Sequence, residues 1–167
     1  MRSAYINPVN LEHVLAALTY ENGLVMRVAM RYGLRVGDVL ELKPEQIRKG
    51  RFTIKEQKTN KSRRISIHGD LQQALLEVSG RYWVFSGRND KTKHRTRQAV
   101  YKDVKRAAKA FRFEHVSPHS ARKCYAVMLR KSGMSFEEIQ ERLNHSDLST
   151  TLLYALSDNV SDVVHVK

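Results

Sequence analysis

The sequence is poor in the residues that mark several classes of protein. It has one cysteine (Cys124), three prolines and eight glycines in 167 residues. A single thiol forms neither an internal disulfide nor a multi-thiolate metal site, and so little proline and glycine excludes a collagen-like or low-complexity chain. No run reaches the roughly 18 apolar residues of a membrane helix, and the start, MRSAYINPVN, lacks the apolar segment of a secretory signal. We therefore expect a globular intracellular protein.

Acidic residues are scarce in two parts of the chain. The sequence holds 30 Lys and Arg against 17 Asp and Glu, a formal net charge of +13. Residues 48–64 contain eight basic residues and one acid, and residues 86–112 contain ten and two. Stretches of nearly one sign favour a polyanionic partner, most commonly a nucleic acid. A basic face with no specific partner and one that meets anionic lipid stay open, although no basic amphipathic helix with a large aromatic face supports the lipid.

Hydrophobic spacing predicts an α+β fold that is mostly helical. Apolar residues recur at helical spacing in 11–18, 24–29 and 36–42, whereas the period changes to two in 52–54 and 65–67. The latter pattern predicts an antiparallel hairpin with a polar, cationic tip at about 57–62. Further helices are expected where start signals occur. Asp70 caps one at 70–78, Thr96 starts one at 96–111, Ser117 with Pro118 starts one at 118–133, and Ser135 with Glu138 starts one at 135–144. A last helix is expected around 151–154. We thus expect a small antiparallel sheet packed against a helical bundle.

His119 and Arg122 stand three positions apart at the predicted start of a helix. Side chains at this spacing share one face, and the unpaired N–H groups of the first turn add positive potential. This corner suits a phosphate oxyanion. A surface pair without function is an open alternative when the motif is considered alone.

Arg35 interrupts an apolar stretch at a predicted helix junction. An arginine beside a core is costly unless it is paired. Asp38, one helical turn further, is therefore expected to pair with Arg35 and to orient its guanidinium. A purely structural pair is the alternative.

Three further side chains could take part in chemistry. Lys58 lies at the predicted hairpin tip, where it could protonate a leaving alkoxide or simply contact a phosphate. His145 lies between two predicted helices, where an imidazole can hydrogen-bond a ligand. Tyr154 follows nine residues later, and its phenol could form a covalent phosphate ester, although ordinary packing is the alternative.

Taken in order, these motifs resemble the tyrosine recombinases of the phage integrase family. They are G-L-R-V-G-D at 33–38, Q-K-T-N-K-S-R-R-I-S-I at 57–67, S-P-H-S-A-R at 117–122 and L-N-H-S-D-L-S-T-T-L-L-Y at 143–154. The resemblance covers residues 8–158, and it is specific because the elements agree in type, order and spacing. Asn144 departs from the pattern, since the family often has glycine there.

The resemblance implies a tyrosine-recombinase-like catalytic domain and site-specific DNA recombination. In the family, a tyrosine attacks a scissile DNA phosphate, which gives a 3'-phosphotyrosyl intermediate and a free 5'-hydroxyl. The hydroxyl of a second strand then attacks the phosphotyrosine and reverses the step. Fixed donors suit the charge that a transferring phosphoryl group gathers, so neither a cofactor nor a metal is expected. The implied catalytic set is Arg35, Lys58, His119, Arg122, His145 and the nucleophile Tyr154.

The resemblance also implies partners and a location. Double-stranded DNA is the expected partner, with self-association into a tetrameric synapse, no membrane contact, and a cytoplasmic, nucleoid-associated location. The residues expected to contact DNA are Lys61, Arg63, Arg64, Arg95, Arg97, Lys105 and Arg106. We interpret residues 1–167 as a single catalytic domain, without the family's N-terminal helical domain.

Two other functions remain open at this point. A type IB topoisomerase uses similar residues for strand cleavage, and a non-catalytic DNA-binding module would keep the basic stretches. A covalent adduct with nicked DNA would exclude the binding module, and joining of strands between two duplexes would separate a recombinase from a topoisomerase.

Overall fold

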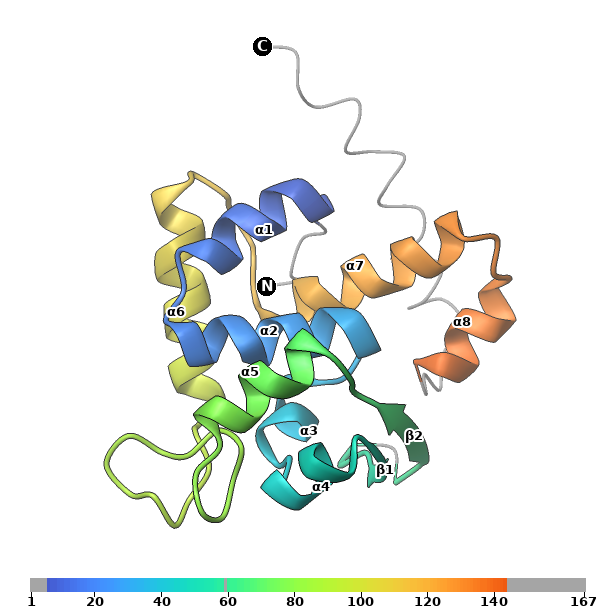
Figure 1. Ribbon diagram of the computed structural model, residues 1–167. Coiled ribbons are helices and arrows are strands. Elements are labelled where there is room, and N and C mark those ends of the chain that lie inside the picture. Colours follow the sequence, from blue (N-terminus) through green and yellow to red (C-terminus); the bar gives the residue numbers. More distant parts are fainter. Residues whose placement is uncertain (1–5, 59, 144–167) are drawn as a thin grey trace.

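The structure is a computed structural model that describes residues 6–58 and 60–143. In these residues, one two-stranded antiparallel sheet packs at the edge of a bundle of helices, as predicted (Figure 1). The helices are α1 (Pro8–Ala16), α2 (Tyr20–Tyr32), α3 (Val36–Leu40), α4 (Pro44–Lys49), α5 (Asp70–Val78), α6 (Arg97–Ala110), α7 (Pro118–Lys131) and α8 (Phe136–Arg142). The strands are β1 (Arg51–Lys55) and β2 (Ser62–Ser66). No helix in the described part is long and apolar enough to cross a membrane.

Helix α2 is the centre of the bundle. It contacts α1, α3, α5, α6 and α7, and seven of its 13 residues are buried. Its N-terminus is capped from another helix, because Asp103 of α6 accepts hydrogen bonds from the Thr19 backbone N–H at 2.9 Å and from Asn22 Nδ2 at 2.7 Å. The core of the protein is therefore organised around α2.

Gly33 ends α2 in a left-handed conformation, with φ 62°. Only glycine adopts this conformation without cost, and here it also lacks space for a side chain. An added Cβ would lie 2.3 Å from Cδ1 of Tyr125 on α7. The close approach of α7 to this end of α2 fixes where the chain continues toward Arg35.

The hairpin follows the predicted alternation. Phe52 pairs with Ile65 and Ile54 with Arg63 across the two strands, and both isoleucines are buried. Helix α4 was not predicted, since a proline that follows a helical stretch commonly marks a break. Pro44 stands in the first turn of α4, where the N–H that proline lacks needs no partner.

The local start signals of the later helices are confirmed. Thr96 caps α6 by accepting from the Ala99 N–H at 3.2 Å, and Ser117 and Ser135 cap α7 and α8. Asp70 differs, since it is the first residue of α5 and provides no side-chain cap. The helix expected around 151–154 lies outside the described residues.

Candidate active site

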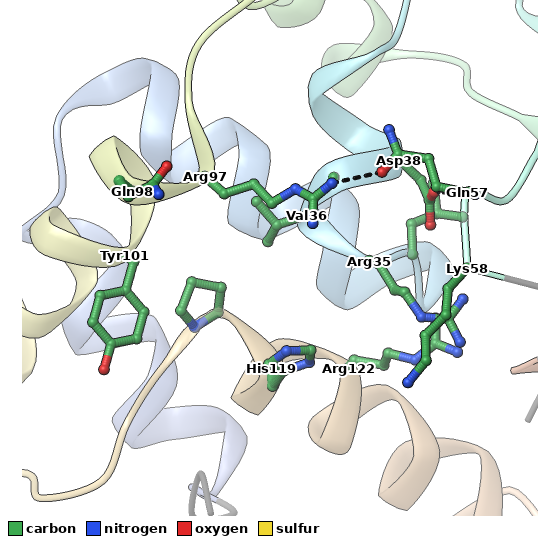
Figure 2. Close-up of a pocket in the computed structure, with 13 residues that line it drawn as sticks. Arg35, Val36, Asp38, Gln57, Lys58, Arg97, Gln98, Tyr101, His119 and Arg122 are labelled. Carbon is green, nitrogen blue, oxygen red and sulfur yellow. Dashed lines mark hydrogen bonds between the residues drawn. The ribbon is translucent and has the colours of Figure 1, made fainter. Parts of the chain in front are cut away.

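A pocket of about 720 Å³ lies between α3, the hairpin connection and the N-terminal ends of α6 and α7 (Figure 2). Its lining includes four of the predicted catalytic residues, together with three residues of α6. The four are Arg35, Lys58, His119 and Arg122, and the three are Arg97, Gln98 and Tyr101. The other two predicted residues, His145 and Tyr154, lie outside the described residues.

The four residues reach the pocket from three parts of the fold. Arg35 is the extended residue that precedes α3, and Lys58 is an exposed residue of the hairpin connection. His119 and Arg122 lie on the first two turns of α7, at the spacing that brings both to one face. Figure 2 shows Arg35, Lys58 and Arg122 converging, with His119 beside them.

Arg35 is paired with Glu56, so the expected pairing with Asp38 is wrong. Arg35 Nη1 donates to Glu56 Oε2, and the other carboxylate oxygen of Glu56 accepts from Arg63 Nη1 at 3.2 Å. Asp38 Oδ1 accepts the backbone N–H of Gln57 at 3.0 Å. Glu56 lies fully buried at the end of β1, where the fold brings it to the start of α3. The sequence carried one signal for it: Glu56 is the single acid of the basic stretch 48–64.

Asp38 is a buried residue of the pocket wall with one oxygen that accepts no hydrogen bond from the described residues. Among residues 6–58 and 60–143, no group donates a hydrogen bond to its Oδ2. Burial raises the pKa of Asp38 and the charge of Glu56 adds to this effect, whereas the Gln57 hydrogen bond opposes it. Asp38 thus joins the hairpin connection to α3 instead of orienting Arg35.

Arg122 is buried and connects three helices. Its Nη1 donates to the carbonyl oxygen of Gly33 at the end of α2, and its Nη2 donates to that of Leu143 at the end of α8. A guanidinium held by two backbone carbonyls has a fixed plane. The position of this positive charge at the pocket is therefore set by the packing of α2, α7 and α8.

His119 has an environment that opposes protonation. The pocket walls desolvate its imidazole, and the positive charges of Arg122 and Arg35 add to the effect, so that its pKa lies below the usual 6.5. His119 is accordingly neutral at pH 7. A neutral imidazole offers one hydrogen-bond donor and one acceptor.

A second contact anchors the segment that carries Lys58. Arg97 Nη2, at the start of α6, donates to Gln57 Oε1 at 2.7 Å, as the dashed line in Figure 2 shows. Gly37 of α3 lies under this contact, because an added Cβ would meet Arg97 Nε and Gln57 Oε1, each at 3.0 Å. Gln57, the residue before Lys58, is thus fixed to both α3 and α6.

The residues predicted to contact DNA fall into two groups. Lys61, Arg64 and Arg97 are exposed, and Lys105 lies half-buried with its Nζ 5.7 Å from the centre of the Tyr101 ring. These four remain accessible from the outside of the molecule, and Arg97 also donates to Gln57 within the protein.

The other three make internal contacts that were not predicted, although the Arg106 side chain is 60% exposed. Arg63 donates to Tyr32 O at 2.7 Å, Arg95 to Asn22 Oδ1 at 3.2 Å, and Arg106 to Ala17 O at 2.6 Å. Each therefore supports the fold, and contact with DNA stays a prediction. No group of three or more histidine, cysteine or acidic side chains suited to a metal occurs in the described part of the chain.

The chain was compared with known protein families. The model of the phage integrase family matches residues 5–160. The chain belongs to the phage integrase family. It is 33% identical over 149 residues to the tyrosine recombinase XerD of Rhizobium meliloti, covering 79% of this chain and 46% of the relative. It is also 33% identical over 156 residues to XerC of Neisseria meningitidis serogroup B, covering 88% and 48%.

Solved structures of this family share the fold. The XerH site-specific recombinase bound to its palindromic difH substrate superposes with a TM-score of 0.72 at 20% identity, covering 99% of this chain and 54% of that one. A lambda integrase dimer bound to a COC' core site gives 0.73 at 21% identity, covering 93% and 60%. The chain spans about half the length of the curated relatives that it matches.

Proposed function

We propose that this chain carries the catalytic part of a site-specific DNA recombinase that cleaves and rejoins strands through a covalent bond at Tyr154. The convergence of Arg35, Lys58, His119 and Arg122 on one pocket is the observation that carries the proposal. These residues come from three separate parts of the sequence, and together they supply donors of the kinds that a transferring phosphoryl group requires. Membership of the phage integrase family supports the same reaction.

In the proposed reaction, the phenolic oxygen of Tyr154 attacks the scissile phosphorus. The bond from phosphorus to the 5'-oxygen breaks, and Lys58 gives a proton to that oxygen. Arg35 and Arg122 bind the non-bridging oxygens, on which negative charge accumulates. The 3'-phosphotyrosyl bond retains the energy of the broken linkage, so a 5'-hydroxyl of a second strand can displace the tyrosine.

The two histidines complete the proposed site. Neutral His119 can donate to a phosphate oxygen and has a lone pair that can accept the phenolic proton. The described chain ends at Leu143, whose carbonyl accepts from Arg122, and His145 follows two residues later in the sequence. This connection supports a place for His145 at the same phosphate.

Double-stranded DNA is the proposed substrate, and assembly of four copies on paired sites is the proposed working form. The exposed Lys61, Arg64 and Arg97 and the half-buried Lys105 supply charge for phosphate contacts. Each neutralised phosphate releases counterions, so the affinity for DNA should fall steeply as salt rises. The chain spans half of its relatives, so these properties are proposed for the catalytic part alone.

Covalent capture tests the proposal. The protein is mixed, in EDTA, with a library of nicked duplexes that contain a randomised segment, and adducts that resist detergent are isolated and sequenced. We expect an adduct with wild type and none with Tyr154→Phe, which still binds DNA because it lacks only the attacking oxygen. An adduct with Tyr154→Phe, or none with wild type on any sequence, would contradict the proposal.

A second measurement distinguishes recombination from relaxation. Two duplexes that carry the selected site, one of them labelled, are incubated with wild type, and the products are sized after deproteinisation. Joining of strands between the duplexes is expected from a recombinase. Nicking and resealing within one duplex only would indicate a topoisomerase instead.

A further inference from the structure

We infer that Glu56 and Arg63 form a largely buried pair that positions two arginines of the pocket, Arg35 and Arg122. This inference rests on the proposed function, since it assigns Arg35 and Arg122 to the phosphate. Glu56 and Arg63 are positioning residues, because they act through those arginines.

Glu56 is held in place by its backbone as well as by its side chain. Its N–H donates to Lys61 O at 3.0 Å, and its carbonyl accepts from the Asn60 N–H at 2.9 Å, which closes the base of the hairpin connection. The Glu56 side chain has no exposed surface, and its two carboxylate oxygens accept from two different guanidiniums, those of Arg35 and Arg63. It thus holds Arg35 by a fixed acceptor that water cannot replace.

Arg63 links this carboxylate to the second arginine of the pocket. Its Nη2 donates to Tyr32 O at 2.7 Å, and its Nη1 lies 3.2 Å from Glu56 Oε1 and 3.5 Å from Gly33 O. The same Gly33 carbonyl accepts from Arg122 Nη1. A continuous set of contacts therefore runs from Arg35 through Glu56, Arg63 and Gly33 to Arg122.

The Glu56 carboxylate lies between two positive charges that would otherwise repel each other, those of Arg35 and Arg63. The side chains of Arg35 and Arg63 are only 17% and 14% exposed, so solvent screens them little. The Glu56 carboxylate offsets this repulsion and uses one end of the Arg35 guanidinium, which leaves its other donors for the pocket. In Glu56→Gln, an amide NH2 would replace one acceptor oxygen and would face an arginine as a second donor.

The test compares two DNA substrates that carry the selected site. In one, the scissile linkage is a normal phosphate; in the other it is a methylphosphonate, which lacks the negative charge on a non-bridging oxygen. Loss of a positioned arginine matters less when that charge is absent. The proteins are wild type, Glu56→Gln, Arg35→Ala, the double variant, and Asp103→Asn as a control.

With the phosphate substrate, we expect Glu56→Gln to slow single-turnover cleavage by about 10- to 100-fold with little change in DNA affinity. The loss of cleavage rate in Glu56→Gln should be smaller on the methylphosphonate substrate than on the phosphate substrate. The same should hold for Arg35→Ala. The loss of rate in the double variant should be much smaller than the product of the two single losses, because Glu56 acts mainly through Arg35. Asp103→Asn weakens the cap of α2 and should change the cleavage rates of both substrates by the same factor.

Equal losses on the two substrates, or additive effects of Glu56→Gln and Arg35→Ala, would overturn the inference and leave Glu56 with a role in folding alone. If Glu56→Gln does not fold, Arg63→Lys serves instead. Lysine keeps the charge but cannot reach both Glu56 and Tyr32 O, so it should give the same dependence on substrate.

A separate measurement keeps this inference distinct from the proposed function. Rotation about the Arg35 Cζ–Nη bonds can be followed by side-chain nitrogen NMR in the protein without DNA. Wild type should show slowed rotation and Glu56→Gln should lose it. If wild type forms no covalent adduct, the proposed function fails, and this spectrum still decides whether Glu56 holds Arg35.

Discussion

Arg122 donates a hydrogen bond to the carbonyl oxygen of Gly33, 89 positions earlier in the chain. The first residue lies on α7, and the second ends α2 in a left-handed conformation. A backbone carbonyl at the end of a helix has no partner in that helix, and here a catalytic candidate supplies it. The same contact therefore completes the fold and fixes the charge at the pocket.

Arg122→Lys should impair both functions of this contact. Lysine keeps the positive charge but lacks the planar fork that reaches Gly33 O and Leu143 O together. We expect cleavage of the selected duplex to slow by about two orders of magnitude or more, on the scale of a lost transition-state donor. Single-turnover kinetics of adduct formation would measure the cleavage rates of wild type and Arg122→Lys. A rate within a few-fold of wild type would contradict the assigned role.

Gly33→Ala should destabilise the protein more than a matched change at another glycine. Alanine at a positive φ is strained, and its Cβ would overlap the Tyr125 ring. We expect a loss of about 2 kcal/mol or more in the free energy of unfolding, measured by denaturant titration. Gly133→Ala is the control, because Gly133 has a φ of +92° but nothing within 4 Å of an added Cβ. Equal losses would show that the contact with Tyr125 contributes nothing.

Lys58→Ala should be rescued by a change in the leaving group. A substrate with sulfur at the bridging 5' position leaves as a thiolate, which needs no proton, so the variant should cleave it at a rate near that of wild type. Arg122→Lys should gain no such advantage, since it acts on the non-bridging oxygens. Rates of both variants on the oxygen and sulfur substrates test this difference. Equal rescue of the two variants would assign Lys58 a different role.

The His119 imidazole should make stability depend on pH. The pKa of His119 is below its usual 6.5 in the folded protein. Between the folded and the unfolded pKa, the unfolded chain therefore binds more protons, so the free energy of unfolding falls as pH falls. His119→Gln removes this contribution. Denaturant midpoints from about pH 7.5 to about pH 5.5 should therefore decline less steeply in the variant than in wild type. Parallel profiles would mean that His119 has the same pKa folded and unfolded.

Features that depend on near neighbours in the sequence were predicted well. The caps at Thr96, Ser117 and Ser135 act over two or three residues, so their signals are complete within a short window. The alternation that predicts the hairpin is similarly local. The motifs also identified four residues that the structure brings to one pocket, because their types and spacing resemble those of a known family.

Contacts between distant parts of the chain could not be predicted in the same way. The pairing of Arg35 with Glu56 spans 21 positions, whereas Asp38 was the near acid and was wrongly expected as the partner. Arg106 was expected to contact DNA, which stays a prediction, and its contact with Ala17 O, 89 positions away, was not expected. Neither partner differs in residue type from many others in the sequence.

The sequence by itself determined the family, the mostly helical fold and the chemistry of the pocket residues, because periodicity, caps and motifs are written in short segments. Only the tertiary structure decided how these residues are held. The end of α2, the base of the hairpin and the start of α7 meet at Gly33, and their meeting gives Glu56 and Arg63 their partners. A buried charge takes whichever opposite charge the packing brings within reach, and packing is a property of the whole chain.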